Sequence, residues 1–146
     1  MLAIAGGAWL LSPAWLEESA AAGRWLPEAP YAVRGGRFAR GVERSRAAHE
    51  AGEPPLLAGH VLLLLGKGVG VKAVARLVTE LGGALTSRPP AATAVVVCGA
   101  AAEGAGPPAA PPGLPGGVPA VREEWILLAA EGYLLPPLGP PYSVAL

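Results

Sequence analysis

Thiols and imidazoles are scarce in this sequence, and their scarcity limits the chemistry it can perform. Its 146 residues include one cysteine, Cys98, and two histidines, His49 and His60. A single cysteine excludes an internal disulfide framework and suits a reducing compartment. The three side chains have no metal-ligand spacing, so we expect no metal site and no cofactor. Cys98 and His60 could form a nucleophile–base pair on neighbouring strands, but a buried thiol and a strand histidine are the simpler interpretation.

An excess of charge of either sign is also missing, as are long apolar runs. Lysine and arginine total 11, aspartate and glutamate total 11, and the net charge at pH 7 is therefore zero. The field of the whole molecule gives no reason to expect a nucleic-acid or membrane-surface partner. The longest strongly apolar run, Val61–Leu65, is far too short to span a membrane. Residues 1–11 are apolar without a basic segment, so we expect no signal peptide.

What the sequence does contain is an internal repeat. Residues 9–31 and 118–142 each offer a short strand, a turn, a helix that begins near a tryptophan, a terminating glycine, prolines and a tyrosine. Trp15 and Trp125, the two tryptophans at the helix starts, are 110 positions apart. A repeat of this kind predicts two copies of one structural unit.

The first copy lacks most of its unit, because few residues precede its strand. We therefore expect the C-terminal part of a first unit in residues 1–33. A linker would follow in residues 34–55, and one complete unit in residues 56–146.

The complete unit alternates between strand and helix patterns. An apolar series at helical spacing faces a polar series over residues 71–81, and Gly82-Gly83 predicts the end of that helix. Alternating strands and helices favour an α/β fold with a parallel four-stranded sheet flanked by helices. We expect strands over residues 8–11, 56–65, 84–87, 94–98 and 118–121, and helices over residues 1–5, 13–22, 38–48, 71–81 and 122–131.

This order of elements, with Gly82-Gly83 after the first helix of the unit and Trp125 in the last, resembles the BRCT repeat. Trp15 stands at the matching place of the incomplete copy, so the chain resembles the C-terminal part of a tandem BRCT pair. Residues 99–117 depart from the family pattern, because a proline- and glycine-rich loop replaces the second helix.

The resemblance implies a non-enzymatic scaffold module of the DNA-damage response and cell-cycle checkpoint. Such a module is nuclear and binds a phosphorylated protein tail. An alternative in the same family is the BRCT appendage of a DNA-repair enzyme, such as a ligase or polymerase, that mediates protein–protein contacts.

The resemblance also implies where a phosphopeptide would bind. In such pairs the first repeat holds the phosphate through a Ser/Thr-Gly pair and a lysine, and these positions would fall before Met1. A groove between the repeats reads the residue three places after the phosphoresidue. Its wall would map to Val78, Glu124 and Leu127. We therefore expect poor phosphopeptide binding by residues 1–146 alone.

Two basic features allow a second interpretation. Lys67 and Gly68 lie between a strand and a helix, where a helix N-terminus could hold an anion weakly. The spacing fits neither a P-loop nor a dinucleotide-binding loop, so an ordinary glycine turn is the simpler interpretation. Residues 34–46 carry several arginines that could contact nucleic acid. With zero net charge and no aromatic platform, a solvated linker with a short helix is favoured, and direct nucleic-acid contact is not expected.

The large apolar residues of the repeat are best interpreted as core anchors. A buried indole contributes a large apolar area, so Trp15 and Trp125 would each fix a helix on its sheet. Gly82 and Gly83 would serve the same core by ending a helix closely packed against it.

Overall fold

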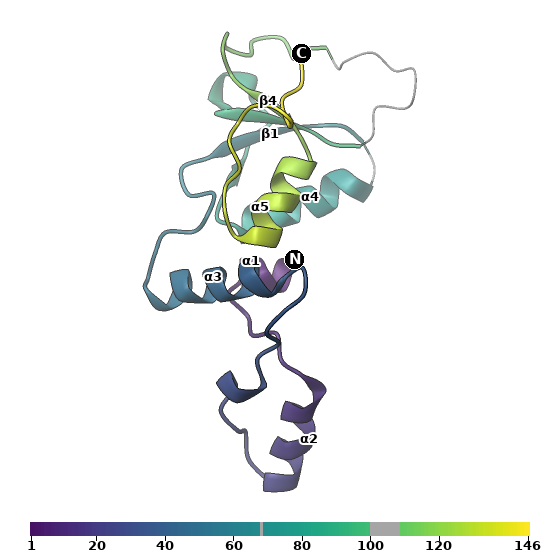
Figure 1. Cartoon of the computed structure of the whole chain (residues 1–146). Helices are drawn as coiled ribbons and strands as arrows, with labels where there is room; N and C mark the ends of the chain where they lie inside the picture. Colours follow the sequence, from purple (N-terminus) through teal and green to yellow (C-terminus); the bar gives the residue numbers. More distant parts are fainter. Residues whose placement is uncertain (68, 100–108) are drawn as a thin grey trace.

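The computed structural model describes residues 1–67, 69–99 and 109–146, and its centre is a parallel sheet (Figure 1). The strands are β1 (Val61–Leu65), β2 (Ala84–Leu85), β3 (Ala94–Val97) and β4 (Ala120–Arg122). They lie in the order β2-β1-β3-β4, and every pairing is parallel. The apolar runs of β1 and β3 suit this arrangement, because a parallel sheet is covered on both faces. The predicted α/β class, a parallel four-stranded sheet with flanking helices, is confirmed.

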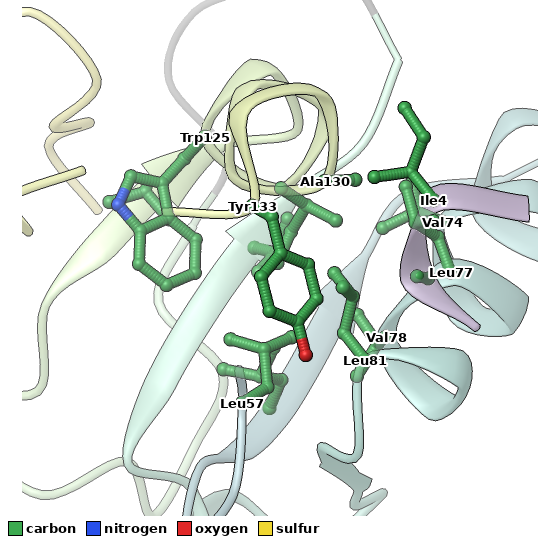
Figure 2. Packing of buried hydrophobic residues seen from close by; sticks show 14 of the residues in the cluster. Ile4, Leu57, Val74, Leu77, Val78, Leu81, Trp125, Ala130 and Tyr133 are labelled. Atoms are coloured by element: carbon green, nitrogen blue, oxygen red, sulfur yellow. The ribbon is translucent and has the colours of Figure 1, made fainter. Parts of the chain in front are cut away.

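Helices α4 (Val69–Glu80) and α5 (Glu124–Gly132) cover one face of this sheet (Figure 1). The apolar series of α4 points inward as its spacing predicts, and Trp125 and Ile126 of α5 are 1% and 0% exposed. Figure 2 shows Trp125 of α5 in one cluster with Val74, Leu77 and Val78 of α4, and Ile126 belongs to the same cluster. This cluster contains many more buried residues than the cluster on the opposite face, so this face holds most of the core. Each large apolar side chain that is buried contributes about 1.5–3 kcal/mol to stability.

Two glycines end α4 where the chain runs too close to its neighbours for a side chain. Gly82 has φ +80°, and a Cβ at this position would overlap Pro55. A Cβ on Gly83 would lie 2.9 Å from Cγ1 of Val78. The glycine pair therefore both stops the helix and lets the preceding loop pack over it.

A smaller cluster covers the opposite face of the sheet. Leu63, Val95 and Ala120 are buried there, packed against partly buried residues that include Leu114 and Val144. The C-terminal tail reaches this face because the N–H of Val144 donates to the carbonyl of Ala120 at 2.8 Å. Of the loop predicted over residues 99–117, residues 100–108 lie outside the described part of the chain, and residues 109–117 form turns.

Three helices precede the sheet along the chain: α1 (Leu2–Ala5), α2 (Pro13–Ala22) and α3 (Ala39–Glu50). Short 3-10 helices η1 (Ala29–Tyr31) and η2 (Pro89–Ala91) complete the elements. Figure 1 shows α1 and α3 beside α4 and α5, whereas α2 stands apart at one end of the molecule. Within the described residues, no helix has the length and hydropathy that a membrane span requires.

Two strand predictions are wrong. The strand expected over residues 56–65 begins only at Val61, because the chain before it turns and the Leu57 N–H donates to the Leu81 carbonyl at 2.8 Å. The strand expected over residues 8–11 amounts to one antiparallel bridge between Leu11 and Ala32. It is not buried, since in the described part of the chain the sheet consists of β2, β1, β3 and β4 only, and Leu10 stays 41% exposed.

The internal repeat corresponds to two pieces of this fold. We call residues 9–31, which contain α2, the first-copy segment, and residues 118–142, which contain β4 and α5, the second-copy segment. The division of the chain at residues 33 and 55 stays a prediction. Most of the predicted linker is α3, and it packs on α1 and α5.

Candidate functional site

The two copies of the repeat share one tryptophan anchor. In the first-copy segment, Nε1 of Trp15 donates to the Leu26 carbonyl at 2.8 Å. In the second-copy segment, Nε1 of Trp125 donates to the Pro136 carbonyl, also at 2.8 Å. Each bond joins a helix start to the proline-rich stretch that follows the helix. The sequence repeat is therefore also a structural one.

The backbone of each copy closes in the same way. The Ser12 N–H donates to the Tyr31 carbonyl and the Arg122 N–H donates to the Tyr142 carbonyl, each at 2.9 Å. Ser12 directly precedes α2 and Arg122 lies two positions before α5, so each bond joins the start of a helical segment to the tyrosine at the end of its copy. The two copies therefore share both their sequence pattern and the hydrogen bonds that close the chain around the helix.

Burial separates the two copies. Trp125 and Ile126 are buried under the sheet and α4, whereas Trp15 is only half-buried. Trp15 stacks on Trp25, with ring centroids 5.0 Å apart, and Trp25 is 72% exposed. Leu16, which corresponds to Ile126, is 59% exposed. Trp15 is therefore a local anchor of α2 and not the centre of a core.

Helix α1 lies among the helices of the complete unit. Ile4 and Ala5 are 5% and 2% exposed and belong to the main core. Figure 2 shows Ile4 beside Val74 and Leu77 of α4, and α1 also contacts α3 and α5. A piece of the predicted first unit and the complete unit therefore share one apolar interface.

Helix α3 packs closely on both sides of this interface. A Cβ on Gly41 would overlap the carbonyl oxygen of Glu131, at the C-terminal end of α5. The buried Ser45 hydroxyl donates a hydrogen bond to the carbonyl of Ile4 in α1. The linker predicted to be solvated therefore has a buried face, which joins α1 to α5.

Three of the five arginines in residues 34–46, namely Arg37, Arg44 and Arg46, make contacts within the protein. Arg37 forms two hydrogen bonds to the Glu131 carboxylate, at 2.5 and 2.6 Å. This pairing raises the pKa of Arg37 and lowers the pKa of Glu131. Arg46 bonds Glu50 at 2.6 Å and lies over the Trp9 ring. These contacts favour the structural interpretation of the arginines over a nucleic-acid interface.

The three residues assigned to a specificity groove lie in different environments. Val78 is 0% exposed, so its side chain packs inside the core instead of lining a surface groove. Glu124 is exposed in the first turn of α5, and Leu127 is half-buried at the margin of the core. The groove assignment of Glu124 and Leu127 stays a prediction.

Among the residues that the structure describes before and at the start of α4, we find no built anion site. Lys67 is exposed, and Gly68 lies outside the described residues. Val69, which opens α4, is 84% exposed. In the ranges 1–67, 69–99 and 109–146, no group of three or more histidine, cysteine, aspartate or glutamate side chains could hold a metal ion.

Cys98 and His60 cannot act as a catalytic pair. The Cys98 N–H bonds the Leu65 carbonyl at the end of β1, whereas His60 precedes the start of the same strand. The strand separates them by about 15 Å. Burial, and secondarily the charge of Glu123, raise the pKa of Cys98 to about 11, so its thiol is protonated at neutral pH.

Gly41 and Ser45 are the residues that sequence reasoning missed. The signal was present, because Gly41, Ser45 and Ala48 form a line of small residues at helical spacing within an otherwise charged segment. Such a line indicates a helix that approaches another backbone closely. The many arginines around this line are more typical of a solvated linker, and so they favour the wrong interpretation.

Comparison with known proteins finds one kind of likeness. The chain matches no protein-family model and no curated protein. Among solved structures it is similar to the crystal structure of the BRCT5-BRCT6 domains of S. pombe Brc1, at 22% sequence identity and a TM-score of 0.47. The match covers 66% of this chain and 53% of that one, so the chain spans about half the length of that structure.

Proposed function

We propose that this chain is the C-terminal part of a tandem BRCT pair and binds a phosphorylated protein tail as a scaffold module. The proposal includes a nuclear role in the DNA-damage response and no catalytic step. It rests first on the sequence marks at Gly82-Gly83, Trp15 and Trp125, which resemble two BRCT repeats. The parallel sheet with helices on one face is compatible with that family.

The observation that supports a tandem arrangement is the position of α1. Ile4 and Ala5 are buried against α4 and α5, although they precede the first-copy segment in the chain. A unit that begins upstream of α2 would therefore share its interface with the complete unit. Two units joined by an apolar interface and a packed linker behave as one body, which a ligand groove between them requires.

The proposed recognition divides between two kinds of contact. The phosphate would accept charge-assisted hydrogen bonds from the Ser/Thr-Gly pair and the lysine of the first unit. We assign none of these phosphate-binding residues within residues 1–146. The tail beyond the phosphate would meet the exposed start of α5, where Glu124 and the half-buried Leu127 offer an acidic and an apolar contact. The second contact sets specificity more than affinity.

A finer likeness concerns which tandem pair this is. The stretch IAGGAWLLSPAWLEES, followed by GRWLPEAPYAV, resembles those of the mediator of DNA damage checkpoint protein, of PTIP and of the breast cancer type 1 susceptibility protein. The linker stretch FARGVERSRAA favours the first of these three. This likeness is the basis for the proposed checkpoint role.

Binding of a tail peptide tests the proposal. The full-length protein encoded by the gene, and residues 1–146 alone, would each be titrated with a peptide that ends shortly after a phosphoserine. The unphosphorylated peptide is the control. We expect phosphate-dependent binding by the full-length protein and at least tenfold weaker binding by residues 1–146.

Variants then test the second contact. Glu124→Ala should change the preference for the residue three places after the phosphoserine, whereas Glu17→Ala, an exposed helical glutamate in α2, should not. No phosphate dependence in either protein would reject the proposal and favour the appendage of a DNA-repair enzyme. A Kd near 1 μM for residues 1–146 alone would reject the proposal that the first unit supplies the phosphate contacts.

A further inference from the structure

One buried polar contact joins α1 to α3. The side chain of Ser45 is 0% exposed, and its hydroxyl donates to the Ile4 carbonyl, 41 positions earlier in the chain. Ser19 is the other buried polar residue of the described chain, and its hydroxyl serves only its own segment, by accepting from the Leu26 N–H at 3.2 Å. Ser45 therefore has a role between elements that Ser19 lacks.

The same buried face of α3, one turn earlier, is fixed to the end of α5. Gly41 allows the backbone of α3 to touch the Glu131 carbonyl, and Arg37 holds the Glu131 carboxylate with two bonds. One turn further along α3, Arg44 donates to the Gly132 carbonyl at 3.1 Å. A single helix thus contacts both the last turn of α5 and α1.

Helix α1 cannot hold this position through its own backbone. It has four residues, and a helix of that length is not stable in water without tertiary contacts. Its apolar side chains, Ile4 and Ala5, give it affinity for α4 and α5 but do not define its orientation, because apolar contacts are non-directional. The hydrogen bond from Ser45 supplies the direction.

We infer that α3 is a strut that sets the position of α1 against α4 and α5, with Ser45 and Gly41 as its positioning residues. The positioning of α1 by α3, the structural part of the inference, does not depend on any ligand. The functional part rests on the proposed function: in a tandem pair, this strut fixes the two units relative to each other and so sets the width of the phosphopeptide groove.

The sequence offers a direct readout, because its two isoleucines lie on the two sides of this interface. Ile4 is in α1 and Ile126 is in α5, and both are buried. Selective 13C labelling of isoleucine methyl groups therefore gives one signal for the docking of α1 and one for the core of the complete unit. A loss of overall stability would affect both signals, whereas a loss of positioning affects Ile4 alone.

We expect Ser45→Ala to weaken the docking of α1 about fivefold, the effect of one net hydrogen bond. The Ile4 methyl signal should move and its cross-peaks to Val74 and Leu77 should weaken, while Ile126 is unchanged. Gly41→Ala should act in the same direction. Ser19→Ala, the matched buried serine, should leave Ile4 unchanged. An Ile4 signal that stays in place in both the Ser45 and Gly41 variants would overturn the inference.

A binding measurement on the full-length protein completes the test. If the wild-type protein binds the phosphopeptide, Ser45→Ala should weaken that binding several-fold and Ser19→Ala should not. Unchanged binding in the presence of a displaced Ile4 signal would overturn the functional part. If the wild-type protein binds no phosphopeptide, the proposed function fails, and the isoleucine signals still decide the structural part.

Discussion

The first-copy and second-copy segments have the same local hydrogen bonds but different surroundings. In each segment a tryptophan N–H bonds a carbonyl beyond the helix at 2.8 Å. Trp125 is only 1% exposed, whereas its counterpart Trp15 is half-buried and stacks on Trp25, which is 72% exposed. The difference is the cover: a sheet and α4 lie over α5, and neither lies over α2. Local sequence therefore sets the hydrogen bonds of this motif, whereas tertiary packing sets its contribution to stability.

Removal of the two tryptophans should have the largest and most unequal effects. Trp125→Ala should lower the free energy of unfolding by about 3–5 kcal/mol, because it empties the centre of the core. Trp15→Ala should lower it by about 1 kcal/mol, because the ring is half-buried in a segment with little tertiary packing. Urea denaturation of both variants measures this. Equal losses would contradict the comparison.

Glycine-to-alanine changes should have opposite effects on stability at a closely packed position, Gly41, and at an open one, Gly70. Gly41→Ala should cost about 1–3 kcal/mol, because the new methyl group overlaps the Glu131 carbonyl and α3 must move. Gly70→Ala, in α4, should gain about 0.5–1 kcal/mol, since the nearest atom would be 3.8 Å away and alanine favours a helix. Thermal unfolding of both variants gives the two signs, and a stabilising Gly41→Ala would contradict this packing.

A smaller effect concerns a residue at which the copies differ. Ser19 accepts from the Leu26 N–H, whereas its counterpart Ala129 needs no hydroxyl, because the counterpart of Leu26 is Pro136, which has no N–H. The Ser12 N–H bonds the Tyr31 carbonyl, so its exchange with solvent reports the opening of the whole first-copy segment. Ser19→Ala should speed this exchange about fivefold, as expected for one lost hydrogen bond.

The same substitution should have little effect in a Leu26→Pro background, which reproduces the second-copy chemistry. Hydrogen exchange followed by NMR would measure the two backgrounds side by side. An undiminished effect of Ser19→Ala beside proline would show that the hydroxyl serves something other than the Leu26 N–H.

The smallest effect should be a pH dependence at the α3–α5 contact. Hydrogen bonding to Arg37 lowers the pKa of Glu131 below its ordinary value of 4.5. The stabilisation from this pair is therefore present at neutral pH and is lost as the pH falls through the lowered pKa. The difference in urea midpoint between the wild type and Glu131→Gln should shrink between pH 7 and pH 3. A difference that grows toward pH 3 would contradict the assignment.

The sequence predicted the elements that carry regular patterns. The helical spacing of Val74, Leu77 and Val78 predicted α4, the repeat predicted α2 and α5, and apolar runs predicted β1 and β3. The start of β1 was wrong because Leu57 is as apolar as the strand itself. Its place in a turn depends on a bond to Leu81, which no local pattern indicates.

The candidate site was less predictable, because it depends on which elements meet. Val78 belongs to the apolar series of α4, and only the packed structure shows that it faces the core centre rather than a groove. Gly41 and Ser45 gain their importance from contacts with residues far away in sequence. Spacing can reveal that such residues share a helix face, but it cannot name the partner.

The most direct test of the proposed function is to map a phosphopeptide on the isotope-labelled full-length protein by NMR. We predict phosphate-dependent shifts at Glu124 and Leu127, with smaller ones at Ile4, and none in the loop around Trp25. Shifts confined to the arginines of residues 34–46, or absent with every phosphopeptide, would contradict a groove between two units.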